Sequence, residues 1–124
     1  MNTLVIDAVG EASPGIVLDS AKNIFEITGW SYPEDAATFF DPVFTWLSEY
    51  AKEPNADTTF HFNFHYFNTA SAKQIFKIIS LLEAIASKSK TTIHWHYDKD
   101  DEDMLNVGQR FSKMSTVPFQ FIAK

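Results

Sequence analysis

A change of hydrophobic period between residues 60 and 85 is the clearest structural signal in this chain. Apolar and polar side chains alternate from residue 60 to residue 66, the two-residue period of a strand with one apolar and one largely polar face. The apolar positions then recur at spacings of three and four, which is typical of an amphipathic helix: Ile75, Ile78, Ile79, Leu82 and Ile85. The sequence therefore predicts a strand that runs directly into a helix, with Asn68 or Thr69 as the helix N-cap.

The same patterns predict the first half of the chain. Short strands are expected at 16–19 and 24–28, joined by a hairpin turn, with Gly29 ending the second strand. Ser31-Tyr32-Pro33-Glu34 has the spacing of a capping box with Ser31 as the cap, so a helix is expected to follow. Pro42 lies inside that helix, and we expect it to kink the helix rather than restart it.

Strands at 91–97 and 118–122 and a helix at 100–113 complete the pattern. This order predicts an α/β fold, a single domain with a mixed sheet of about five strands and helices packed mainly on one face. A right-handed crossover would make the strands that end at Tyr66 and Tyr97 parallel, and Thr69 and Asp98 would then be near neighbours.

Composition supports one domain with a sizeable core. The chain has 124 residues, 45% of them hydrophobic, with twelve phenylalanines. The absence of cysteine excludes disulfides, thiolate metal sites and cysteine nucleophiles, and is compatible with the cytoplasm. A net charge of −6 without a basic stripe argues against nucleic acid as a partner. The apolar run at the N-terminus stops at Asp7, too short for a signal peptide, and no segment has the length of a membrane span.

The predicted helix start at residue 69 is the first candidate for chemistry. Thr69 and Ser71 place hydroxyls where unpaired backbone N–H groups and the helix dipole would hold a phosphate. Lys73, four residues after Thr69, would pair with that phosphate, whereas the acids of the loop at 98–103 would repel it. Helix capping without regulation explains the same residues, so both interpretations stay open at this point.

Two further clusters are candidates for metal binding. The acidic loop 98–103 offers carboxylates, but its sixth residue is aspartate where a calcium loop needs glycine, and no glutamate stands at position twelve. The spacing of His61, His65, His94 and His96 points all four to one sheet face, where they suit a zinc site, a half-exposed polar face or a dimer contact. We assign no metal ligand and no cofactor, and keep a small metal-binding protein as the alternative function.

Five short motifs resemble one protein family in their order and gaps. They are Ser31-Tyr32-Pro33-Glu34, Tyr66-Phe67-Asn68-Thr69-Ala70-Ser71, Trp95-His96-Tyr97-Asp98, Asp101-Glu102-Asp103-Met104 and Ser115-Thr116-Val117-Pro118-Phe119. Together they span nearly the whole chain, which resembles the SiaC-type regulatory phosphoproteins, formerly a bacterial domain of unknown function. The resemblance implies a single domain over residues 1–124, similar in fold to the STAS-type anti-sigma-factor antagonists.

The resemblance also implies a function in signal transduction without catalysis. A serine/threonine kinase of the anti-sigma-factor type would phosphorylate a threonine, and a PP2C-type phosphatase would remove the phosphate. Only the unphosphorylated form would bind the target by partner switching. In the best-understood arrangement that target is a diguanylate cyclase, which the bound protein activates. This implies a role in cyclic-di-GMP signalling and biofilm formation, in the bacterial cytoplasm and without membrane insertion.

The family's phosphorylated threonine falls on Thr69. Where family members often carry a second serine or threonine, this chain has Ala70, so Thr69 is the expected acceptor and Ser71 the runner-up. The expected surroundings of the phosphate are Asn68, Ala70, Lys73 and Asp98. The expected partner contacts are Trp30, Tyr32, Asn68, Thr69 and Ser71, although the two large aromatics among them equally suit a covered core edge.

Overall fold

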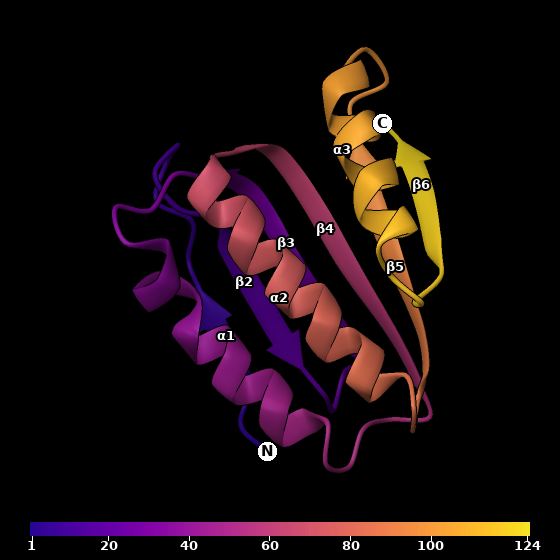
Figure 1. Ribbon diagram of the computed structural model, residues 1–124. Coiled ribbons are helices and arrows are strands. Elements are labelled where there is room, and N and C mark those ends of the chain that lie inside the picture. The colour runs from indigo at the N-terminus through magenta and orange to yellow at the C-terminus, as the bar shows by residue number, and fades with distance from the viewer.

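Six strands form one mixed sheet, and three helices pack on one of its faces (Figure 1). The computed structural model describes residues 1–124. Its elements are, in chain order, β1 (Leu4–Ile6), β2 (Gly15–Asp19), β3 (Ile24–Ser31), α1 (Ala36–Tyr50), β4 (Asp57–Phe67), α2 (Thr69–Ile85), β5 (Lys90–Tyr97), α3 (Glu102–Lys113) and β6 (Phe119–Ala123). None of the three helices combines the length and the hydrophobicity that crossing a bilayer requires.

The strands lie side by side in the order in which they follow one another along the chain. The pairs β1–β2 and β2–β3 are antiparallel, and the pairs β3–β4, β4–β5 and β5–β6 are parallel. The predicted α/β class, with a mixed sheet and parallel β4 and β5, is therefore confirmed.

The expected count of five strands is wrong because β1 escapes prediction. Its three residues are too few to display a two-residue period. Leu4 pairs with Leu18 and Ile6 with Ile16, and both β1 side chains pack against the core while Val5 points to solvent.

Alternation along the strands separates the two faces of the sheet. Phe60, Phe62 and Phe64 of β4 and Ile93 and Trp95 of β5 are buried on the face that the helices cover. The other face carries half-buried, mainly polar side chains: Glu26, Thr28, His61, Asn63, His94 and His96. Since successive side chains of a strand point to opposite faces, we call this second, helix-free side the polar face (Figure 1).

The helix after β3 begins later than the capping box predicts. Ser31 is the last residue of β3, and its carbonyl accepts a hydrogen bond from the N–H of Asn68. The N-cap of α1 is Asp35, whose carboxylate accepts hydrogen bonds from the N–H (3.2 Å) and the hydroxyl (2.8 Å) of Thr38. The prediction of Ser31 as the cap is wrong because pairing with β4 holds this residue in the sheet.

Neither Gly29 nor Pro42 ends the element in which it lies. The expectation that β3 stops at Gly29 is wrong, because this glycine adopts a positive φ of 105° and the register with β4 shifts between Gly29 and Trp30. Such a bulge lets the strand continue. The alternative that Pro42 restarts the helix is wrong, because one helix runs through this residue.

Close contact with Trp95 holds α3 against the sheet. Asp101 caps this helix by accepting a hydrogen bond from the N–H of Met104 at 3.0 Å, and the Trp95 indole N–H donates to the Met104 carbonyl at 3.0 Å. One turn later, a Cβ on Gly108 would lie only 2.5 Å from atoms of the Trp95 ring. The absence of a side chain at Gly108 therefore sets how closely α3 approaches β5.

Candidate functional site

Thr69 is the first residue of α2, and its side chain is exposed. Of the two predicted N-cap candidates, Asn68 is the cap: its side-chain oxygen accepts a hydrogen bond from the N–H of Ser71 at 2.8 Å. Backbone N–H groups at the start of a helix point outward, and the helix dipole favours negative charge there. Because Asn68 caps the helix, the hydroxyl of Thr69 is not needed for that role.

Ser71, two residues further on, is completely buried. Its hydroxyl lies 2.8 Å from the hydroxyl of Ser31 and donates to the Ser31 carbonyl at 3.2 Å. The N–H of Asn68 donates to the same carbonyl at 3.1 Å. These contacts tie the start of α2 to the end of β3, so a kinase or a docked partner does not reach Ser71 in this conformation.

Thr69 stands on the rim of a groove of about 300 Å³ between the end of β4, the start of α2 and the second half of α3. Its apolar lining residues are Tyr66, Phe67, Ala72, Val107, Phe111 and Met114, and its polar ones are Asn68, Thr69 and Arg110. Two of these large side chains are well exposed, Tyr66 at 48% and Met114 at 57%. The groove thus offers apolar surface that a partner could cover.

Arg110 is the basic residue of this groove. It is exposed in the last turn of α3 and takes part in none of the ion pairs of the structure. Lys73, the predicted phosphate partner, is exposed one turn along α2 and lies outside the groove lining, and Ala70 is exposed in the first turn. A phosphate on Thr69 would therefore share the groove with a guanidinium, the group best suited to bidentate phosphate binding.

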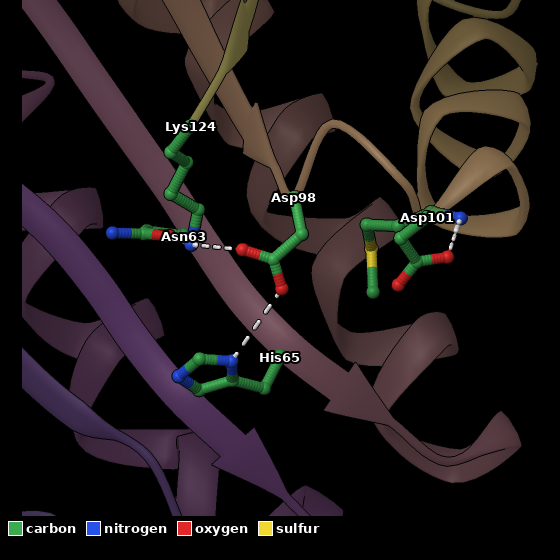
Figure 2. A network of polar contacts seen from close by, with 6 residues as sticks. Asn63, His65, Asp98, Asp101 and Lys124 are labelled. Atoms are coloured by element: carbon green, nitrogen blue, oxygen red, sulfur yellow. Dashed lines mark hydrogen bonds and ion pairs between the residues drawn. The ribbon is translucent and has the colours of Figure 1, made fainter.

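Asp98 belongs to a separate polar network at the ends of β4 and β5 (Figure 2). Its carboxylate lies 3.9 Å from Nδ1 of His65 and 3.8 Å from Nζ of Lys124, which also bonds to the side chain of Asn63. Asp98 is not part of the groove lining. The charged side chain of the groove lining is that of Arg110.

The acidic loop does not gather its carboxylates around one point. In Figure 2 the carboxylate of Asp98 faces His65 and Lys124, whereas that of Asp101 turns to the start of α3, where it caps the helix. The side chains that do lie close enough together to hold a metal ion are histidines.

Tyr32 and Trp30 stack on different residues near the end of β3. Tyr32 is 44% exposed and stacks on Tyr66, with ring centroids 5.2 Å apart, so it extends the apolar rim of the groove. Trp30 is half-buried and stacks on His65 of the polar face, with centroids 5.8 Å apart. Tyr32 is therefore placed for a partner in the groove, whereas Trp30 covers part of the other face.

Three of the four histidines converge on the polar face. One ring nitrogen from each of His61, His94 and His96 lies within 4.8 Å of the other two. Desolvation lowers the pKa of His61 and of His96, and the neighbouring imidazoles lower it further. Both rings are therefore neutral at neutral pH. His65 is exposed and lies beside Asp98, outside this cluster.

The contribution of α3 to the groove was not predicted from the sequence. Val107 and Phe111 pack against the core, whereas Arg110 and Met114 are exposed. These four residues recur at spacings of three and four and form one stripe of the helix. This spacing indicates that the four residues share one side of α3, but it does not reveal which of them stay exposed to solvent.

Comparisons with known proteins place the chain in a family. Residues 8–124 match the model described as SiaC family regulatory phosphoprotein. An uncharacterized protein of Pseudomonas aeruginosa strain UCBPP-PA14 is 26% identical over 110 residues, which cover 88% of this chain and 87% of that protein.

Solved structures agree with this match. The crystal structure of apo-SiaC from Pseudomonas aeruginosa is 25% identical and matches with a TM-score of 0.88, over 99% of this chain and 100% of that one. The crystal structure of the diguanylate cyclase SiaD in complex with its activator SiaC, from the same organism, matches with a TM-score of 0.89 at 25% identity, over 98% of this chain and 99% of the matched one. The match to the family model covers nearly the whole chain, including Thr69 and every residue of the groove. The chain belongs to the SiaC family of regulatory phosphoproteins.

Proposed function

We propose that this chain is switched by reversible phosphorylation of Thr69 and that its unphosphorylated form binds and activates a diguanylate cyclase. A serine/threonine kinase of the anti-sigma-factor type would add the phosphate, and a PP2C-type phosphatase would remove it. The chain itself would act by binding rather than by catalysis. The solved complex of SiaC with the diguanylate cyclase SiaD supports the choice of partner.

The position of Thr69 carries this proposal. Its exposed side chain stands at the N-terminus of α2, on the rim of a groove with a mainly apolar lining. Of the two candidate hydroxyls, a kinase can reach that of Thr69 directly, whereas Ser71 is buried and hydrogen-bonded to Ser31. The same residue is therefore accessible to a modifying enzyme and placed to control what enters the groove.

A phosphate on Thr69 would change the groove in two ways. It would add a charge of about −1.5 to −2, which the helix N-terminus and Arg110 would hold in place. It would also set a strongly hydrated group beside the exposed apolar surface of Tyr66 and Met114. A partner that covers the groove would have to strip water from this dianion, which is costly. Phosphorylation should therefore release the cyclase.

The test compares binding to a purified diguanylate cyclase from the same organism. We expect the unphosphorylated protein and Thr69→Ala to bind and to activate the cyclase. The protein phosphorylated on Thr69 should bind at least about tenfold more weakly, and Thr69→Asp should be weakened in the same direction but less, because a carboxylate carries less charge than a phosphate.

Thr45→Asp is the matched control for added charge. Thr45 is exposed on α1 and is not part of the groove lining, so this variant should bind as the unmodified protein does. Equal affinities of the phosphorylated and unphosphorylated proteins would contradict the switch. An equal loss of binding in Thr45→Asp and Thr69→Asp would show that charge acts without regard to the groove.

A further inference from the structure

We propose a second binding site, on the polar face of the sheet: His61, His94 and His96 form a site for one divalent transition-metal ion, with Zn²⁺ as the expected occupant. The site and the groove beside Thr69 lie on opposite faces of the sheet. The inference is therefore independent of the proposed phosphorylation switch.

Strand register brings the three imidazoles together. His61 on β4 and His94 on β5 are direct cross-strand neighbours, and His96 follows two residues further along β5. The ring centroid of His61 is 4.9 Å from that of His94 and 5.2 Å from that of His96. Nitrogens bound to tetrahedral zinc lie about 2.0–2.1 Å from the ion and hence roughly 3.3 Å from one another. Side-chain rotation alone can close a cluster whose nitrogens already lie within 4.8 Å.

The contact between His61 and His96 shows what a metal ion would replace. Nδ1 of His61 and Nε2 of His96 are 2.9 Å apart and share a hydrogen bond, so one of these two nitrogens carries the proton. Each neutral imidazole keeps one nitrogen with a lone pair. A change of tautomer in the donor ring would turn both lone pairs toward an ion without a net loss of protons.

Charges of both signs surround the cluster. Glu26 of β3 is the cross-strand neighbour of His61 and sets a carboxylate next to it, which favours a bound cation. The positive charge of Lys124 near His96 would disfavour a bound cation. The ammonium of Lys124 is, however, hydrogen-bonded to Asn63 and lies 3.8 Å from the carboxylate of Asp98. The nearest negative charge is thus on a direct neighbour of the cluster, and the nearest positive charge is already paired.

The ligand chemistry selects the class of ion. Imidazole nitrogen suits Zn²⁺, Cu²⁺ and Ni²⁺, whereas Mg²⁺ and Ca²⁺ prefer oxygen ligands. Three histidines with an open fourth position are an established zinc arrangement, and the half-buried polar face leaves that position open to water or to the carboxylate of Glu26. Because the ligands come from β4 and β5, a bound ion would link these two strands and stabilise the folded state.

Calorimetric titration of tag-free, EDTA-treated protein with Zn²⁺ tests the site. We expect one ion per chain. His61→Gln, His94→Gln and His96→Gln should each raise the dissociation constant by about tenfold or more, since even outer-shell partners act on this scale. His65→Gln is the matched control, because His65 lies on the same strand and face but outside the cluster, and it should leave the affinity unchanged. Lys124→Gln should tighten binding.

A measurement on the unaltered protein guards against variants that fail to fold. Addition of Zn²⁺ should shift the imidazole NMR signals of His61, His94 and His96 and leave that of His65 in place, and it should raise the melting temperature. Zinc binding that is no tighter than in the triple glutamine variant, or that is lost equally in His65→Gln, would overturn the proposal. So would zinc-induced shifts confined to His65.

Discussion

Ser31 and Ser71 form a buried contact that fixes the first turn of α2, where Thr69 lies. Their hydroxyl oxygens lie 2.8 Å apart, both side chains are completely buried, and forty residues separate them in the chain. The carbonyl of Ser31 accepts two further hydrogen bonds, from the hydroxyl of Ser71 and from the N–H of Asn68. These hydrogen bonds therefore fix the backbone around the exposed Thr69, whose position does not depend on a flexible loop.

This arrangement predicts different outcomes for the two hydroxyl residues. Ser71→Ala should lower the free energy of unfolding by about 1–3 kcal/mol, because the buried hydroxyl of Ser31 loses its partner, while Thr69 remains a kinase substrate. Thr69→Ala should end phosphorylation and change stability little, because Asn68 supplies the cap. Denaturant unfolding and intact-mass analysis of both variants after kinase treatment check the prediction. Phosphate retained in Thr69→Ala but lost in Ser71→Ala would assign the acceptor to Ser71.

Arg110 should stabilise only the phosphorylated form. A phosphate on Thr69 would raise the free energy of unfolding by pairing with this guanidinium, and Arg110→Ala should reduce that increment by about 0.5–1 kcal/mol, the scale of an exposed ion pair. The unphosphorylated protein should be unaffected. The measurement is a double-mutant cycle of denaturant unfolding, with and without phosphate, and Lys73→Ala as the control outside the groove. If only Lys73→Ala reduced the increment in the free energy of unfolding, the phosphate would pair with Lys73 and not with Arg110.

Periodicity located the elements that are long enough to show it. The junction of β4 with α2, with a cap at Asn68 or Thr69, follows from patterns within one segment. The parallel pairing of β4 with β5 follows from a general crossover rule. The start of α1 was misplaced because the capping box around Ser31 is a local signal. The role of Ser31 is decided by a contact with Ser71, and local spacing does not carry that information.

The difference between local patterns and contacts of distant segments also explains which parts of the candidate site could be predicted from the sequence. Thr69 could be predicted because its place at a helix start depends on neighbouring residues. Arg110 and Met114 could not, since their role depends on how α3 packs against the sheet. The contact of Gly108 with Trp95 controls this packing, and it joins two elements that no local pattern connects.

Gly108→Ala tests that contact. In an exposed helix interior this substitution would stabilise the protein by up to about 1 kcal/mol. Here the added Cβ would lie 2.5 Å from the Trp95 ring, so α3 must move outward. We expect a net loss of about 1–3 kcal/mol in the free energy of unfolding, as for an overpacked core. Urea unfolding measures it, with Asn106→Ala as the exposed control on the same helix. A stabilised Gly108→Ala protein would mean that Trp95 can turn aside.

Met114→Glu tests whether the groove is the surface that the cyclase covers. Met114 is 57% exposed, so the substitution should leave the fold and its stability intact. It would place a negative charge in the apolar lining of the groove that Thr69 also borders, and should weaken cyclase binding by about tenfold without any phosphorylation.

Surface plasmon resonance with the unphosphorylated protein measures this effect, with Val5→Glu as the matched control. Val5 is 59% exposed on β1, which is one edge strand of the sheet, whereas α3 packs on β5 and β6 at the other edge. The Val5→Glu variant should therefore bind normally. Wild-type affinity in Met114→Glu would show that the cyclase docks elsewhere. Phosphorylation of Thr69 would then have to act on a different surface than the groove, since the added charge at Met114 reproduces the main physical effect proposed for the phosphate.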